Sequence, residues 1–232
     1  MSFGMQTHAA SENVSGYAIF PSVLTHVEAA CITEALNEKT IDRSRAGARH
    51  LMHHPVVDRI ARDPRLVALA RQFLGPSAIP FRATLFDKSP DNNWLVVWHQ
   101  DTALPLRERR DVSGWGPWSV KAGVTYARAP ASALSRVVAL RLHIDDSGPG
   151  NGPLRVLPGT HTRGVMSDAE VAQLARDVQP VDCVSPAGGI VAMRPLLVHA
   201  SSKAETDHRR RVLHIEYADS LDIEAGLELA IA

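Results

Sequence analysis

Short apolar runs separated by polar, turn-forming segments make up most of the chain after its first third. Runs of β-prone residues bounded by glycine, proline and asparagine are typical of strands, and many such runs in succession indicate a sandwich or jelly roll. We therefore expect strands over residues 16–20, 81–86, 94–98, 137–144, 154–157, 189–193 and 212–217.

The first third of the chain follows a helical period. Apolar residues recur at helical spacing between Leu24 and Ala35, and Thr25 stands where it could cap that helix. Further helices are expected over residues 55–60 and 64–74, the latter ended by Gly75 and Pro76, and over residues 167–177 between strands. These patterns predict a mainly β fold, a sandwich with flanking helices on one face.

Residues 113–133 combine glycine, proline and alanine with two tryptophans, and they lack a clear period. We expect a loop here that is too long for a simple connector, and loops of this length are often lids or binding loops. Neither an internal repeat nor a second domain is visible. We expect one domain over residues 1–232, with residues 1–13 as a mobile leader.

Composition narrows the classes of partner. Lys plus Arg is 25 and Asp plus Glu is 25, so net charge gives no case for nucleic acid or an anionic membrane as a partner. No apolar stretch approaches the roughly 20 residues of a membrane helix, and the N-terminus lacks a signal-peptide layout. Cys31 and Cys183 match no metal or redox spacing. We expect a cytoplasmic protein that acts on a small molecule.

Candidate chemistry begins at Trp98-His99-Gln100-Asp101, at the end of a predicted strand. Side chains two apart on a strand share a face, so His99 and Asp101 can reach one point together. His199 follows an apolar approach and is the candidate third ligand. Two histidines and one carboxylate with open positions are typical of iron(II) oxygenases.

An arginine for an anionic cosubstrate comes eleven positions after His199, at Arg210. Its guanidinium fork suits a carboxylate, such as the far carboxylate of 2-oxoglutarate. An uncertainty of one residue in the strand register leaves Arg209 and Arg211 as alternatives.

Three pieces of the chain, WHQD at 98–101, NGPLRVLPGTH at 151–161 and the segment 188–210, resemble the phytanoyl-CoA 2-hydroxylase-like family of iron(II)/2-oxoglutarate dioxygenases. The resemblance covers about residues 16–217. It implies a double-stranded β-helix (jelly roll, cupin-like) and iron held by His99, Asp101 and His199. It also implies a 2-oxoglutarate site to which we assign Arg210, Ser201, Thr84 and Gln100.

The resemblance also marks a departure at Arg141, where some members carry a pocket tryptophan. We expect Arg141 to contact the cosubstrate or an anionic substrate, and the alternative is an ion pair with Asp145 or Asp146. Further candidate substrate contacts are Trp98, Arg107, Trp115, Trp118 and Lys121. The following are expected to be structural: Lys88 as a turn residue, His143, His214 and the hairpin at 151–161.

The function implied is oxidation of an unactivated C–H bond, most simply hydroxylation, which uses Fe(II), 2-oxoglutarate and O2 and releases succinate and CO2. The carboxylate ligand Asp101 argues against halogenating relatives, which replace it with a small residue. Desaturation, demethylation or cyclisation could use the same site. A non-catalytic, cupin-like metal or small-molecule binding protein and a zinc hydrolase are the alternatives from other classes.

Overall fold

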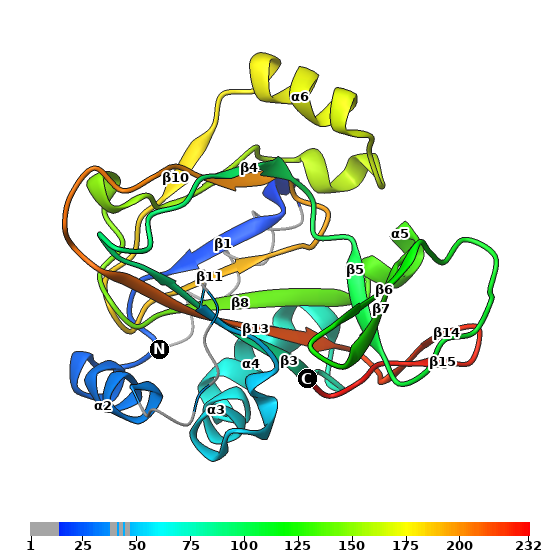
Figure 1. Cartoon of the computed structure of the whole chain (residues 1–232), viewed down its shortest axis with the longest axis horizontal. Helices are drawn as coiled ribbons and strands as arrows, with labels where there is room; N and C mark the ends of the chain where they lie inside the picture. The colour runs from blue at the N-terminus through cyan, green and yellow to red at the C-terminus, as the bar shows by residue number, and fades with distance from the viewer. Residues whose placement is uncertain (1–13, 38–40, 42–43, 45–46) are drawn as a thin grey trace.

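The computed structural model describes residues 14–37, 41, 44 and 47–232 (Figure 1). A six-stranded antiparallel sheet has the order β1-β11-β8-β13-β3-β2, and a four-stranded sheet has the order β10-β9-β12-β4. The strands of the larger sheet are β1 (Tyr17–Phe20), β2 (Gly47–Ala48), β3 (Ile79–Lys88), β8 (Val137–His143), β11 (Ile190–Met193) and β13 (Arg210–Ala218). Those of the smaller sheet are β4 (Val96–His99), β9 (Leu154–Val156), β10 (Val181–Cys183) and β12 (His199–Ser201).

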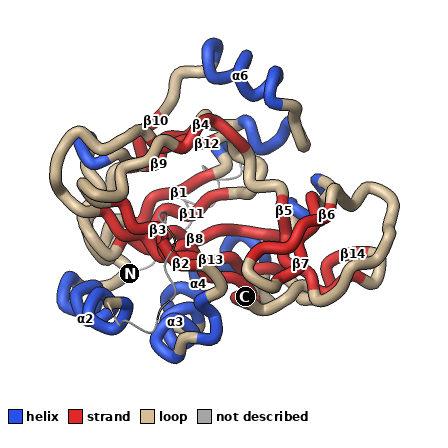
Figure 2. Tube along the Cα trace, in the orientation of Figure 1, coloured by secondary structure: helices blue, strands red, loops and turns tan. Residues whose placement is uncertain are grey.

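The two sheets lie face to face, as the ribbon and the tube both show (Figures 1 and 2). Part of the space between them is filled by an apolar cluster that includes Leu154 and Val156 from the smaller sheet and Val191 and Met193 from the larger one. The remaining part of the inner face carries polar side chains, and the candidate site lies there.

Alternation along β13 explains how one strand serves both a core and a site. Leu213 and Ile215 belong to the apolar cluster that includes helix residues, on the outer face. Their neighbours in the sequence therefore point to the inner face, because the side-chain period of a strand is two. The strand reads as continuously buried because both of its faces are covered.

Three helices cover the outer face of the larger sheet: α2 (His26–Leu36), α3 (Pro55–Ala61) and α4 (Pro64–Leu74). Thr25 forms a capping box with Glu28 at the start of α2, which confirms its predicted role. Helix α6 (Asp168–Asp177) packs instead against the smaller sheet, through Val171 and Leu174. The helices thus cover both outer faces, and the expectation of one helical face is wrong.

The prediction of a loop over residues 113–133 is also wrong. It contains β6 (Trp118–Lys121) and β7 (Val124–Arg128), which pair with β5 (Ala103–Leu106) in a three-stranded sheet, and then α5 (Ala131–Leu134). The β6–β7 turn uses Ala122 at φ 45° and Gly123 at φ 80°. Two positive φ values in succession suit a tight hairpin, but alanine there gives no sequence signal of one.

The short ribbon of β14 (Asp222–Glu224) and β15 (Leu227–Glu228) turns in the same way, through Ala225 and Gly226. The residue types at this turn predict a hairpin no more clearly than those of the β6–β7 turn. No helix in the described ranges is long and apolar enough to cross a membrane. The leader expected over residues 1–13 lies outside the described residues, and the single domain over residues 1–232 stays a prediction.

Candidate metal centre and anion pocket

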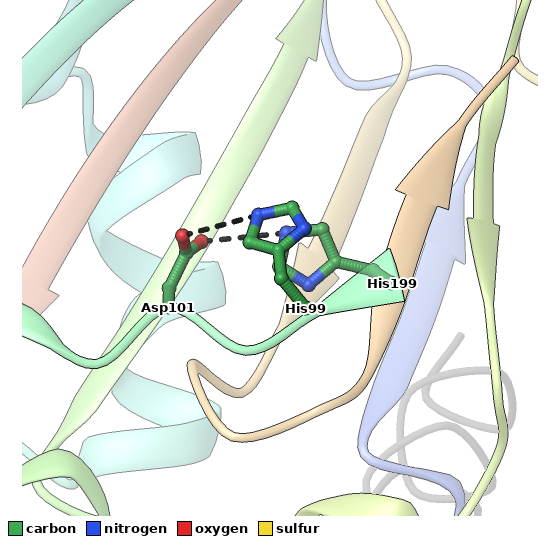
Figure 3. A group of neighbouring side chains, drawn as sticks. All are labelled: His99, Asp101 and His199. Atoms are coloured by element: carbon green, nitrogen blue, oxygen red, sulfur yellow. Dashed lines mark ion pairs between the residues drawn. The ribbon is translucent and has the colours of Figure 1, made fainter. Parts of the chain in front are cut away.

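The two histidines of the candidate metal centre face each other across a strand pair. His99 on β4 and His199 on β12 are direct register partners, with ring centroids 4.2 Å apart. Asp101 follows β4 and its carboxylate points at both rings (Figure 3). Asp101 Oδ1 lies 3.7 Å from His99 Nε2, and Oδ2 lies 3.5 Å from His199 Nε2. One ligand atom from each residue lies within 4.8 Å of the others, so the three can share one ion.

Both histidine rings are oriented by a hydrogen bond to the backbone carbonyl oxygen of the residue two positions earlier. His99 Nδ1 lies 2.8 Å from the carbonyl oxygen of Val97, and His199 Nδ1 lies 2.9 Å from that of Leu197. A carbonyl oxygen only accepts, so each Nδ1 carries the proton and donates. In the neutral ring, Nε2 then keeps its lone pair for a metal.

Electrostatics favour the ligand-competent protonation states. Burial lowers the pKa of His199 to about 4, so this ring is neutral at physiological pH. Burial would raise the pKa of Asp101, but His199 and His99 lower it below the usual range for a carboxylate. The centre therefore presents an anionic oxygen donor from Asp101, a neutral nitrogen donor from His199 and a second imidazole from His99, a set that suits iron(II) with open positions.

Strand register resolves which arginine enters the site. Arg210, two residues before the inward Val212, is 3% exposed and lines the cavity beside the triad. Arg209 pairs instead with Asp87, and Arg211 pairs with Asp145. Of the three arginines, Arg210 is the one that lines the cavity.

Arg210 is held by neutral groups and keeps one unused donor. Its Nε donates to the carbonyl oxygen of Asn151 at 3.1 Å, and its Nη2 donates to Ser201 Oγ at 3.2 Å. Its Nη1 is buried and has no partner, and within the described ranges no carboxylate pairs with this guanidinium. A buried N–H without an acceptor is costly, so the geometry is that of a receptor for an anion.

Lys88 belongs to the same group of cations, which the sequence interpretation missed. It is 1% exposed, and its ammonium donates to Ser201 Oγ at 3.0 Å and to the carbonyl oxygen of Ser202. It lies opposite Arg210 in the β3–β13 register, so the turn role expected for it is wrong. Burial, then Arg210 and Arg141, lower the pKa of Lys88 to about 8. We call Lys88, Ser201 and Arg210 the anion-binding cluster.

The turn at Asn151-Gly152 holds this cluster in place. Besides the bond from Arg210 to Asn151, the carbonyl oxygen of Gly152 accepts from Ser201 Oγ at 2.8 Å. Gly152 has φ 66°, and a Cβ there would lie 2.4 Å from the carbonyl oxygen of Ser202. The purely structural role expected for this hairpin is therefore too narrow, because its backbone carbonyls orient the cluster.

A cavity of about 100 Å³ joins the triad to the anion-binding cluster. Arg141 also lines it, with Nη1 3.0 Å from His214 Nδ1 and the guanidinium 5.3 Å from the centre of the Phe86 ring. Asp145 is paired with Arg211, and Asp146 accepts from the backbone N–H of Ala187, so the alternative ion pair of Arg141 is wrong. The other residues that line the cavity are Trp94, Val96, Leu154 and Ala200.

The structure does not bring the other two assigned cosubstrate contacts to the cavity wall. Thr84 lies on the inner face opposite His214, but it is not among the lining residues. Gln100 is engaged with the backbone: its Nε2 donates to the carbonyl oxygens of Gly164 and Leu196, and its Oε1 accepts from the N–H of Met166.

Most of the suggested substrate contacts lie elsewhere. Trp98 packs toward α6 under Arg155, and Trp115 is buried in the apolar cluster near the β5–β7 sheet. Trp118 packs at the edge of that cluster. Arg107 is exposed and pairs with Glu228 at 2.6 Å. Lys121 lies on β6 and is not among the residues that line the cavity.

Comparison with known proteins places this geometry in a family. The model of the family described as phytanoyl-CoA dioxygenase (PhyH) matches residues 13–212. L-proline trans-4-hydroxylase of Streptomyces griseoviridis is 28% identical over 188 residues, 70% of this chain and 62% of that protein. Ectoine dioxygenase of Bordetella parapertussis is 31% identical over 107 residues, 46% of this chain and 28% of that protein. The chain thus spans less than two thirds of the length of both relatives.

Solved structures agree on the fold. EctD from S. alaskensis, solved with 2-oxoglutarate and 5-hydroxyectoine, superposes with a TM-score of 0.70 at 20% identity, covering 92% of this chain and 75% of that one. The carbocyclase SnoK from nogalamycin biosynthesis gives a TM-score of 0.70 at 16% identity, over 93% and 84% of the two chains. The fold is the double-stranded β-helix, as predicted.

Proposed function

The chain belongs to the phytanoyl-CoA dioxygenase (PhyH) family of iron(II)- and 2-oxoglutarate-dependent oxygenases, and we propose that it oxidises a C–H bond of a small organic molecule. Hydroxylation is the outcome we favour, with 2-oxoglutarate and O2 consumed and succinate and CO2 released. Asp101, the carboxylate of the triad, supports hydroxylation over halogenation. The relatives named for action on proline and ectoine support a small substrate.

His99, Asp101 and His199 would hold the iron, since their donor set and their spacing fit it. When bound, iron(II) supplies the activation of O2 and of the 2-oxo acid. The chain supplies orientation: the carbonyl oxygens of Val97 and Leu197 fix the two imidazole rings. Apolar side chains on the cavity wall, such as Phe86 and Leu154, limit the water beside the reacting groups.

Arg210 would take the distal carboxylate of 2-oxoglutarate through its unpartnered Nη1. Lys88 adds a second positive charge beside Arg210, because both cations donate to Ser201 Oγ. Ser201 Oγ already donates to Gly152 and accepts from both cations, so this hydroxyl fixes the cation geometry. It would have to leave Gly152 before it could donate to a ligand.

The single observation that carries this proposal is the buried Arg210 N–H without a partner, in the same cavity as the triad. A cupin-like protein that only stores metal needs no carboxylate receptor beside the ion. A zinc hydrolase does not need one either. We also propose a cytoplasmic location, which the two free thiols Cys31 and Cys183 support.

The test is an anaerobic titration of the Fe(II)-loaded protein with 2-oxoglutarate, followed by the weak visible charge-transfer band of the chelate. We expect the band in the wild type, its loss in His99→Ala, and a much higher cosubstrate requirement in Arg210→Met. Arg209→Met, one residue away and paired on the outside, is the matched control. Iron binding without a band would refute the cosubstrate assignment. Mass analysis of a product separates hydroxylation, which adds one oxygen, from desaturation or cyclisation.

A further inference from the structure

We propose that Arg141 is a second carboxylate receptor, so that the cavity grips both ends of a 2-oxo dicarboxylate between two guanidinium groups. Arg141 would take the carboxylate next to the keto group, and Arg210 would take the distal one. This inference rests on the proposed function for the identity of the ligand. It adds a positioning contact that holds the cosubstrate even when no metal is bound.

The first argument is that Arg141 is buried without a matching charge. It is 7% exposed, its Nε is buried with no partner, and its one hydrogen-bonded neighbour is the neutral ring of His214. No carboxylate in the described part of the chain forms an ion pair with it. A buried charge without a partner costs several kcal/mol. An anionic group of the ligand that pairs with the guanidinium would offset this cost.

The second argument comes from the charges at the cavity. Arg141 and Arg210 line it, Lys88 lies beside Arg210, and the three cations repel one another. No carboxylate in the described residues forms an ion pair with any of the three. Asp101 is the one carboxylate among the residues that line the cavity. Its charge acts on the pKa of Arg141 more strongly than that of any other acidic group. Once Asp101 binds a divalent metal, its charge is no longer available to Arg141. A dianionic ligand then offsets the excess positive charge, and a monoanion leaves one arginine uncompensated.

The third argument is position along the sheet. Arg141 lies opposite His214 in the β8–β13 register and lines the cavity together with the triad, and both Arg141 and His214 interact electrostatically with Asp101 and His199. Arg210 is four residues further along β13, opposite Lys88. The two arginines therefore enter one cavity from different distances to the metal centre. A ligand with one carboxylate near the metal and one further away matches that spacing.

The experiment measures binding to the metal-free full chain, after treatment with a chelator, by calorimetry. Two probes are used: 2-oxoglutarate, and 4-oxopentanoate, in which a methyl group replaces the carboxylate next to the keto group. We expect Arg141→Met to weaken 2-oxoglutarate binding at least tenfold and to leave 4-oxopentanoate binding within twofold of wild type. Arg210→Met should weaken both. Arg155→Met is the matched control, because Arg155 pairs with Asp182 and does not line the cavity.

Folding is checked by thermal melting without ligand. Removing an uncompensated buried charge should leave the melting temperature of Arg141→Met equal to or above that of the wild type. Arg141→Lys keeps the charge but loses the fork, and we expect an intermediate loss of 2-oxoglutarate binding.

The proposal is overturned if Arg141→Met binds 2-oxoglutarate as the wild type does, or if it loses both probes equally. It is also overturned if metal-free wild type fails to bind 2-oxoglutarate at millimolar concentration. A different result refutes the proposed function: Fe(II)-loaded wild type makes no succinate from 2-oxoglutarate and O2. That result would leave the binding pattern of the metal-free protein intact.

Discussion

Gln100 lies between two metal ligands in the sequence, and its replacement by leucine separates a structural role from a cosubstrate contact. The amide spans a gap between two segments: Nε2 donates to Gly164 at 2.9 Å and to Leu196 at 2.8 Å, and Oε1 accepts from Met166 at 2.9 Å. Each such bond contributes about 1 kcal/mol net. Gln100→Leu should therefore lower the free energy of unfolding by about 3 kcal/mol.

For a chain of this size, about 1 kcal/mol shifts the melting temperature by roughly 2–4 °C. We expect metal-free Gln100→Leu to melt about 6–12 °C below the wild type, by calorimetry or circular dichroism. Gln173→Leu on the exposed face of α6 is the matched control and should change little, since Gln173 bonds only to surface side chains. A Gln100→Leu variant with wild-type melting and a raised KM for 2-oxoglutarate would refute the structural role and restore the cosubstrate contact.

Three further predictions concern the anion-binding cluster and the buried histidine beside it. Arg210→Met should raise the KM for 2-oxoglutarate about 100-fold, because a charge-assisted pair contributes about 3 kcal/mol, and Arg209→Met should not; equal effects would contradict the register. Metal-free 2-oxoglutarate binding should weaken between pH 7 and 9 as Lys88, whose pKa is about 8, loses its proton, and Lys88→Met should remove that dependence in titration calorimetry. Burial lowers the pKa of His143 to about 3, so the unfolded chain alone takes up this proton and stability falls as pH falls from about 6.5 toward 3. His143→Leu should reduce the slope of unfolding free energy there by up to about 1.4 kcal/mol per pH unit, and an unchanged slope would contradict the assignment.

The sequence predicted those parts of the molecule that depend on a side-chain period. Strand alternation predicted that His99 and Asp101 meet at one point, although β4 ends at His99 and Asp101 follows it. For the arginine, the sequence left Arg209, Arg210 and Arg211 open. Helix caps such as Thr25 and the stop at Gly75 were equally readable, because capping depends on the residue type at one position. The metal triad could also be predicted, because its ligands are side chains of recognisable type.

The missing parts depend on backbone groups and on register between distant strands. The carbonyl oxygens that orient His99, His199 and Arg210 belong to residues whose side chains play no part, so residue type gives no signal for them. Lys88 was readable only once β3 was known to extend to it. The hairpin at Ala122-Gly123 escaped because alanine occupies a positive-φ position.

The most direct test of the central claim is the fate of 2-oxoglutarate in the presence of Fe(II) and O2. The purified protein, supplied with 2-oxoglutarate labelled at the carboxylate next to the keto group, should release labelled CO2 and an equal amount of succinate. His199→Ala should release neither, and omission of iron or of O2 should abolish both in the wild type. Succinate formation that persists in His199→Ala, or its complete absence from iron-loaded wild type that binds 2-oxoglutarate, would contradict the account.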